Sequence, residues 1–201
     1  WGRAWVADRA MVEAEAGITA PEPADADEPS ALLDRLRADL VGYQSVRYAK
    51  RFDAVVERVA SLGHDELTDA VARHLHKLMA YKDEYEVARL LLLPATRAQA
   101  QAIGGRKARV TWVLHPPMLR AIGWKRKIDF GRWARPAFAT LRALRHLRGT
   151  PFDLFGVAKV RRVERALVPE YIAAIDALLP HITADNLAEA VAIATLPDKV
   201  R

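Results

Sequence analysis

The sequence predicts a mainly α-helical protein of about six to eight helices, with one small β-hairpin inserted near residues 107–130. Two observations support this fold class. Over most of the chain apolar residues recur every three or four positions, which places them on one face of successive helices. Strict alternation of apolar and polar residues is confined to one stretch, 107–114, and is typical of a half-buried strand. At 201 residues, the chain can bury a core without disulfides or metal ions.

The first 29 residues differ in composition from the rest of the chain. Residues 1–16 are expected to form a short helix that is the tail of an upstream domain, because the chain opens on Trp1 within a helical pattern. Residues 17–29 are rich in Pro and acidic residues, which is typical of an extended linker. The helical domain itself is therefore expected to span residues 30–201.

Three helices are expected between Ser30 and about residue 93. Ser30 is a candidate N-cap of the first, and the second ends near Gly63. The third and longest, about 66–93, carries a continuous apolar stripe. This order predicts that the first half of the domain is helical.

Charged side chains fall on the apolar face of that long predicted helix. Lys82 and Arg89 lie near the centre of the stripe, and Glu86 lies about one turn from both. Because an unpaired buried charge is very costly, the three residues are predicted to form a structural ion-pair network. The alternative is a polar pocket that contacts catalytic domains or a substrate carboxylate.

The second half of the domain begins with the predicted hairpin. Val110, Trp112 and Leu114 lie on one side of the first strand, and 127–130 is its candidate partner. Helical patterns return at about 133–147, 157–179 and 184–196, the last of them capped by Thr183.

Gly149–Gly156 is expected to join two of these helices as an ordered loop. Gly149 suits the end of a helix and Pro151 prevents its continuation. Phe152, Leu154 and Phe155 are expected to insert into the core. The alternative is a loop that is presented to a neighbouring domain.

Positive charge is concentrated in the middle of the chain. Residues 106–165 hold 16 Lys and Arg against 3 acids, so this block carries +13 while the remaining chain carries −7. Its candidate surface for an anion or a partner comprises Lys125, Arg126, Lys127, Arg132, Arg135, Arg148, Arg161 and Arg162. Such a block can bind phosphates such as those of coenzyme A, an acidic protein such as ferredoxin, or the chain's own acidic segments. No nucleic-acid-binding module is recognisable, which disfavours nucleic acid.

The absence of cysteine narrows the chemistry. It excludes iron–sulfur ligation, thiolate zinc sites and cysteine nucleophiles in this chain, and it fits a cytoplasmic protein. His74 and His76 are two residues apart, so on a helix they point in different directions and cannot chelate one ion. No apolar run is long enough for a membrane span. No catalytic, cofactor-binding or metal-ligating residue is predicted.

A series of sequence patterns occurs in a fixed order within the predicted domain. The most distinctive is RGTPFDLFG at 148–156. The others are VARHLHKLMAYKDEYEVAR at 71–89, LHPPML at 114–119, KIDFGRW at 127–133, RRVER at 161–165, EY at 170–171 and LPDKVR at 196–201. Together they resemble the C-terminal domain of the fused, single-chain indolepyruvate ferredoxin oxidoreductases of the 2-oxoacid:ferredoxin oxidoreductase family. Residues 1–3 resemble the end of that enzyme's gamma-type domain.

The resemblance implies a parent enzyme that oxidatively decarboxylates an aryl 2-oxo acid to an acyl-CoA. The parent would use thiamine diphosphate with Mg²⁺, iron–sulfur clusters, coenzyme A and ferredoxin, and we expect it to be a homo-oligomer. None of the residues for that chemistry is present in this chain. The resemblance therefore implies a non-catalytic accessory domain that packs against the catalytic domains of its own parent chain.

Overall fold

The computed structural model describes Met11 and residues 29–105, 109–114, 123, 126–156 and 158–199. The chain divides into two compact units, 1–35 and 36–201. The predicted helix over 1–16 and linker over 17–29 lie outside the described residues, except for Met11, which is helical, and Pro29. The account below concerns the second unit.

The predicted fold class is confirmed. The described residues contain eight α-helices and one two-stranded antiparallel hairpin. The helices are α3 (Pro29–Tyr43), α4 (Val46–Ala60), α5 (Asp65–Met79), α6 (Glu84–Leu91), α7 (Pro94–Gly104), α9 (Arg135–Ala143), α10 (Lys159–Leu178) and α11 (Leu187–Ala194). The hairpin is β1 (Trp112–Leu114) and β2 (Ile128–Phe130), in which Val113 is paired with Asp129.

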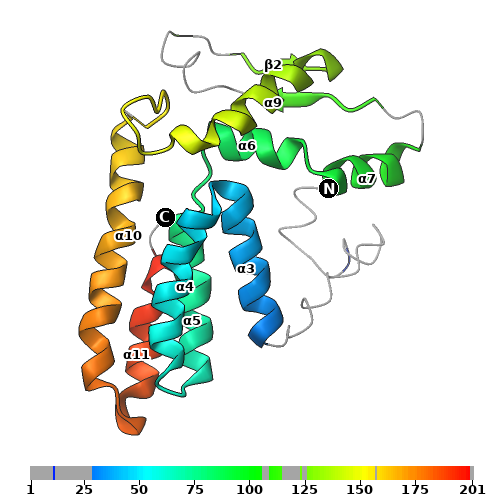
Figure 1. Ribbon diagram of the computed structural model, residues 1–201. Helices are drawn as coiled ribbons and strands as arrows, with labels where there is room; N and C mark the ends of the chain where they lie inside the picture. The colour runs from blue at the N-terminus through cyan, green and yellow to red at the C-terminus, as the bar shows by residue number, and fades with distance from the viewer. Residues whose placement is uncertain are drawn as a thin grey trace. The chain divides into compact units, whose positions relative to one another are not determined.

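Helix α5 is the central element of one bundle. It contacts α4, α10 and α11, and these helices run alongside one another in Figure 1. Helix α4 shows why the sequence folds this way: its buried residues recur at helical spacing, and Ser45 caps it by accepting a hydrogen bond from the amide of Tyr48. The core contains large side chains that are almost completely buried, among them Leu40, Phe52, Leu67, Leu75, Met79 and Ile175.

A second, smaller core lies where α6 packs against α9 beside the hairpin. Phe138 and Ala134 are buried there, and Trp112 and Phe130 pack on Phe138 with ring centroids 5.3 and 5.8 Å away. The alternating burial of β1 and β2 matches the alternation in their sequences, because one face of the hairpin covers this core.

Three expectations about helix boundaries are wrong. The predicted helix over 66–93 is two helices, because α5 ends at Met79 and α6 begins at Glu84. The break occurs because Asp83 caps α6, accepting a hydrogen bond of 2.7 Å from the amide of Glu86. Ser30 is not an N-cap, because α3 already begins at Pro29. The longest helix described is therefore α10.

The 3₁₀ turn Leu196–Asp198 is tied to α5 by ion pairs. The Asp198 carboxylate accepts a hydrogen bond of 2.6 Å from Lys77 Nζ and lies 3.0 Å from His74 Nε2. Hydrogen bonds from Lys77 and then His74 lower the pKa of Asp198 from 3.8 to about 2. The ionised carboxylate thus favours the folded state.

The stability of the protein should therefore fall in acid partly through Asp198. Because its pKa is lower in the folded state, its contribution is complete above pH 3.8 and is lost as the pH falls towards about 2. We expect the Asp198→Asn variant to show a shallower loss of stability across this interval than the wild type, in urea unfolding followed at each pH. Parallel profiles for the two proteins would contradict this assignment.

Candidate functional site

The most deeply buried ion pair joins Arg148 to Asp83. Arg148 Nε lies 2.5 Å from Asp83 Oδ2 and Nη2 lies 2.7 Å from Oδ1, and both side chains are 3% exposed. The third nitrogen donates to the backbone carbonyl of Tyr43. The guanidinium also lies over the Tyr43 ring, 3.7 Å from its centroid. Arg148 therefore connects the end of α3 to the α5–α6 junction.

Electrostatics match this geometry. Burial has the largest single effect on the pKa of Arg148 and would lower it. The hydrogen bonds to Asp83, together with the electrostatic effects of Tyr43, Asp83 and Glu86, outweigh burial, so the pKa is raised. Burial also raises the pKa of the Tyr43 hydroxyl far above its usual value. The guanidinium is thus permanently charged and is neutralised by one carboxylate, which is the arrangement of a structural pair.

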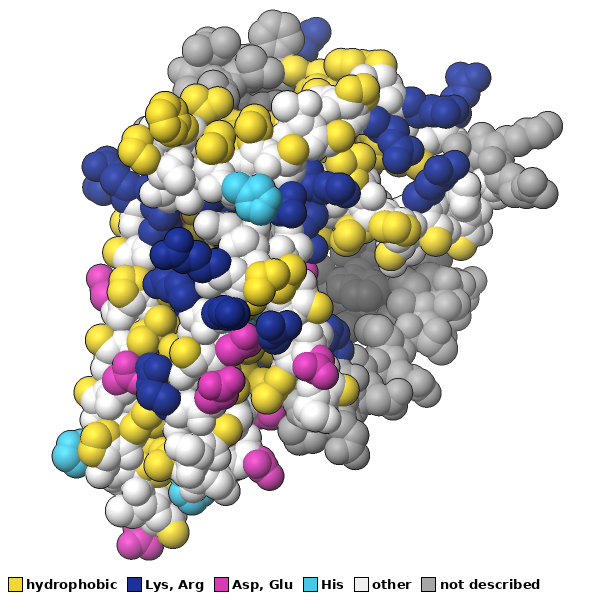
Figure 2. Space-filling view, in the orientation of Figure 1, with side chains coloured by type: hydrophobic (Ala, Val, Ile, Leu, Met, Phe, Trp, Pro, Cys, Tyr) yellow, Lys and Arg dark blue, Asp and Glu magenta, His cyan; other side chains and the backbone are white. Residues whose placement is uncertain are grey.

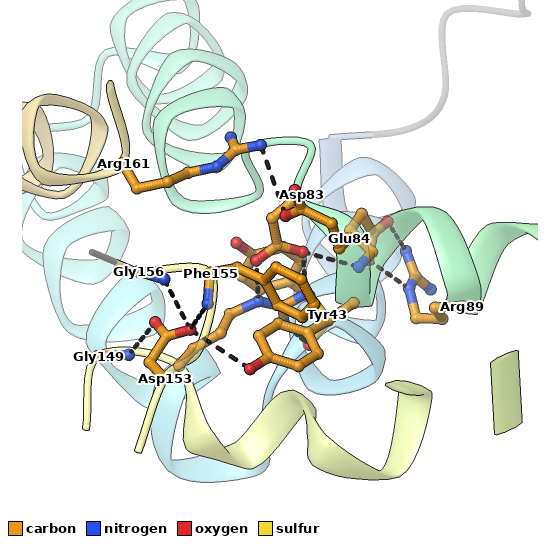
Figure 3. A network of polar contacts seen from close by, with 12 residues as sticks. Tyr43, Asp83, Glu84, Arg89, Gly149, Asp153, Phe155, Gly156 and Arg161 are labelled. Carbon is orange, nitrogen blue, oxygen red and sulfur yellow. Dashed lines mark hydrogen bonds and ion pairs between the residues drawn. The ribbon is translucent and has the colours of Figure 1, made fainter. Parts of the chain in front are cut away.

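Asp153 fixes the loop that follows Arg148. Its carboxylate accepts hydrogen bonds from the amides of Gly149 at 2.9 Å, Gly156 at 3.0 Å and Phe155 at 3.3 Å (Figure 3). Arg165 Nη1 lies 3.1 Å from the same carboxylate. A buried carboxylate with this many donors holds the loop in one conformation.

Gly156 is required by the close packing around Asp153. A Cβ atom at this position would overlap the Asp153 carboxylate and the Arg165 guanidinium. Arg165 Nη2 also donates to the Gly156 carbonyl at 2.6 Å. The glycine is therefore needed for a close approach to its neighbours.

The tip of this loop carries two apolar side chains in solvent. Phe152 is 75% exposed and Leu154 is 67% exposed, whereas Phe155 packs on Tyr85 with ring centroids 5.0 Å apart. The expectation that all three insert into the core is thus wrong for Phe152 and Leu154. The reason is that Asp153 points inwards between them, which turns its two neighbours outwards.

A second polar network surrounds Arg89. Arg89 binds both carboxylate oxygens of Glu86, at 2.8 and 2.7 Å, and reaches Asp39 at 2.6 Å. His76 Nε2 lies 3.0 Å from the other oxygen of Asp39. The hydrogen bonds from His76 and from Arg89 lower the pKa of Asp39, against the opposing effect of burial. Lys82 does not take part, because it is exposed in the segment between α5 and α6.

An apolar pocket of about 470 Å³ opens beside these networks. Its walls include Phe130, Trp133, Phe138 and Phe155. Glu84 also lines it, and its buried Oε2 makes no hydrogen bond, with Arg161 Nη2 3.9 Å away. The pocket could accept an apolar group, and Lys82, Asp83, Glu84 and Arg161 supply the charged part of its lining.

Not all members of the predicted basic surface are available at the surface. Arg148 is 6% exposed and bound to Asp83, so its assignment to a surface patch is wrong. Arg161 is half-buried and pairs with Glu164 at 2.8 Å, so it is not freely available either. The exposed members are Arg126, Lys127, Arg132, Arg135 and Arg162. Lys125 lies outside the described residues.

No catalytic constellation is found in the described part of the chain. No group of three or more His, Asp or Glu residues is arranged there to hold a metal ion. His74 is engaged by the Ala70 carbonyl at 2.6 Å and by Asp198, while His76 faces Asp39. Among the same residues no helix is both long and apolar enough to cross a membrane.

Asp83, Tyr43 and Asp39 are the important residues that the sequence analysis missed. One local signal was present for Asp83, because Asp83 and Glu86 have the spacing of a helix N-terminal capping pattern. No local signal identifies its partner, since Arg148 is 65 positions away.

Comparison with known proteins identifies a family. A model described as a family of unknown function (DUF6537) matches residues 30–201. No curated protein and no solved structure matches the chain.

Proposed function

For this chain, which belongs to the DUF6537 family over residues 30–201, we propose that the domain is a docking module. It would be the C-terminal accessory domain of a thiamine-diphosphate-dependent indolepyruvate ferredoxin oxidoreductase. In that enzyme it would pack against the catalytic domains of its own chain and support assembly of a cytoplasmic homo-oligomer. The parent would convert an aryl 2-oxo acid to an acyl-CoA and pass electrons to ferredoxin.

The observation that carries the docking role is the fixed loop 149–156 with its exposed apolar tip. Exposed Phe and Leu side chains lose little entropy on binding when the backbone beneath them is already ordered. Asp153, Arg165 and the backbone of the loop supply that order. A rigid loop that presents Phe152 and Leu154 is suited to insert into an apolar recess of another domain.

The residues present do not fit a catalytic role for this chain in the parent reaction. Iron–sulfur clusters are held by cysteine thiolates, and the chain has no cysteine. The clusters and the thiamine diphosphate would therefore be bound by other parts of the parent. In this role the domain would act through its contacts with the catalytic domains.

The test uses the full-length parent enzyme with Phe152→Asp and Leu154→Asp introduced together. Placing two carboxylates at the apolar tip should weaken docking by at least tenfold, because an interface residue of this kind contributes roughly 1.4 kcal/mol or more. Analytical ultracentrifugation would measure assembly, and reduction of ferredoxin with indolepyruvate would measure turnover. We expect the oligomer of the double variant to dissociate at a higher protein concentration than that of the wild type, and we expect its turnover to be reduced.

The matched control is Val46→Asp, which places the same charge on another exposed apolar residue, 51% exposed at the start of α4. This control should assemble and turn over like the wild type. Unchanged assembly in the loop double variant would refute the docking role. A full chain with neither cluster cysteines nor a thiamine diphosphate site would instead refute the proposal that the parent is an indolepyruvate ferredoxin oxidoreductase.

A further inference from the structure

We infer that the cleft between α7, the hairpin and the start of α9 is a binding site for a small molecule that carries a phosphate or diphosphate group on an apolar body. The cleft has a volume of about 340 Å³. Arg97 comes from α7, and Arg132 and Arg135 come from the turn into α9. This site lies away from the loop tip and goes beyond the docking role.

Three guanidinium groups share this cleft without a counter-charge. The residues that line it in the described structure include no Asp or Glu. No ion pair or hydrogen bond is made there by the side chains of Arg97, Arg132 or Arg135, whereas Arg89, Arg148, Arg161 and Arg165 are all paired. Figure 2 shows Lys and Arg side chains over the end of the molecule that carries α7 and the hairpin. Such a group of free arginines attracts an anion.

Trp112 supplies an independent indication of a missing partner. It lines the same cleft, and its indole Nε1 is buried without a hydrogen-bond acceptor. Buried donors are nearly always satisfied, so an unpaired one at the wall of a cleft indicates an acceptor that the bound ligand provides. Its ring is held in place against Phe138, so the N–H direction is fixed.

The start of α7 adds donors of the same kind. Leu93 is the N-cap residue and gives no side-chain hydrogen bond, so the first amides of this helix of 11 residues are uncapped. Pro94 and Thr96 of this first turn line the cleft. A helix start of this kind favours phosphate oxygens, and here it stands beside the arginines and the indole.

The remaining wall of the cleft specifies the body of the ligand. Leu91, Leu92, Leu93 and Val110 line it. A free inorganic ion would leave this surface in contact with water. An organic phosphate would cover it while its phosphate binds the forked guanidinium groups.

Isothermal titration of the full chain tests this site with inorganic phosphate, pyrophosphate and butyl phosphate as probes. We expect butyl phosphate to bind more tightly than inorganic phosphate. Alanine at Arg97, Arg132 or Arg135 should each weaken its binding roughly tenfold or more, since hydrogen bonds to charged groups are strong. Arg47→Ala is the matched control, because Arg47 is an exposed arginine of α4 outside the cleft, and the affinity of this variant should equal that of the wild type.

The indole N–H of Trp112 provides a second readout. In ¹H–¹⁵N spectra, its signal, assigned with Trp112→Phe, should move when butyl phosphate binds. The inference is overturned if the three arginine variants bind like Arg47→Ala, if no probe binds, or if the Trp112 signal does not move. Inorganic phosphate that binds as tightly as butyl phosphate would overturn the organic ligand. Tighter binding of a single-stranded oligonucleotide at the same arginines would overturn the small-molecule ligand.

The arginines are exposed, so their replacement should leave the fold intact, as circular dichroism would verify.

Discussion

Replacing Arg148 with alanine is expected to lower the free energy of unfolding by about 3–5 kcal/mol, because it leaves the buried Asp83 carboxylate without its partner. Both side chains of the pair are 3% exposed, so water cannot replace the lost contacts. The substitution also removes the hydrogen bond to the Tyr43 carbonyl. Urea unfolding monitored by circular dichroism would measure the change.

The control for this prediction is Arg58→Ala. Arg58 pairs with Asp176 at 2.8 Å, but their side chains are 46% and 44% exposed, so the loss should be at most about 1 kcal/mol. If Arg148→Ala does not fold, the double variant Arg148→Met with Asp83→Ser keeps a helix cap while removing both charges. It should be more stable than Arg148→Ala. Equal losses for Arg148→Ala and Arg58→Ala would show that burial does not govern the pair.

The second large effect is expected at Asp153. Its replacement by alanine removes the acceptor shared by three loop amides and Arg165. We expect a loss of about 3 kcal/mol, because several donors would remain unsatisfied at once. Thermal unfolding followed by calorimetry would measure it.

Two further variants distinguish this loop anchor from a general effect of mutation in the loop. Gly156→Ala should also destabilise, by about 1–3 kcal/mol, because its Cβ needs the space of the Asp153 and Arg165 side chains. Thr150→Ala alters an exposed residue of the same loop and should cost about 1 kcal/mol or less. Wild-type stability in Gly156→Ala would contradict the close packing described for this loop.

The elements with strong periodicity could be predicted from the sequence. The buried face of α4, the extent of α10 and the alternation of the hairpin each follow from a local repeat that tertiary contacts reinforce. The break at residues 80–83 was missed because the apolar stripe continues through it, and a stripe records burial rather than helix continuity. The three-residue spacing of Asp83 and Glu86 indicates a helix start, and in the structure a new helix does begin after Asp83.

The candidate site was less predictable because its contacts join distant segments. Glu86 and Arg89 are three residues apart on one helix, so helical spacing alone predicts that they pair. Asp39, 50 positions from Arg89, has no such signal. Phe152 and Leu154 show the same limit: hydrophobicity alone predicts burial, and only the inward direction of Asp153 explains their exposure.

The pair of Asp83 and Arg148 also has a consequence for how the family can vary. Asp83 directly precedes α6, and Arg148 directly follows the turn after α9. The pair therefore joins the two ends of the intervening segment, residues 84–147, which includes α6, α7, the hairpin and α9. The entropy cost of closing a segment into a loop grows only slowly with the length of the segment. Relatives should thus be able to lengthen, shorten or replace this inserted region during evolution while the bundle around α5 keeps its architecture.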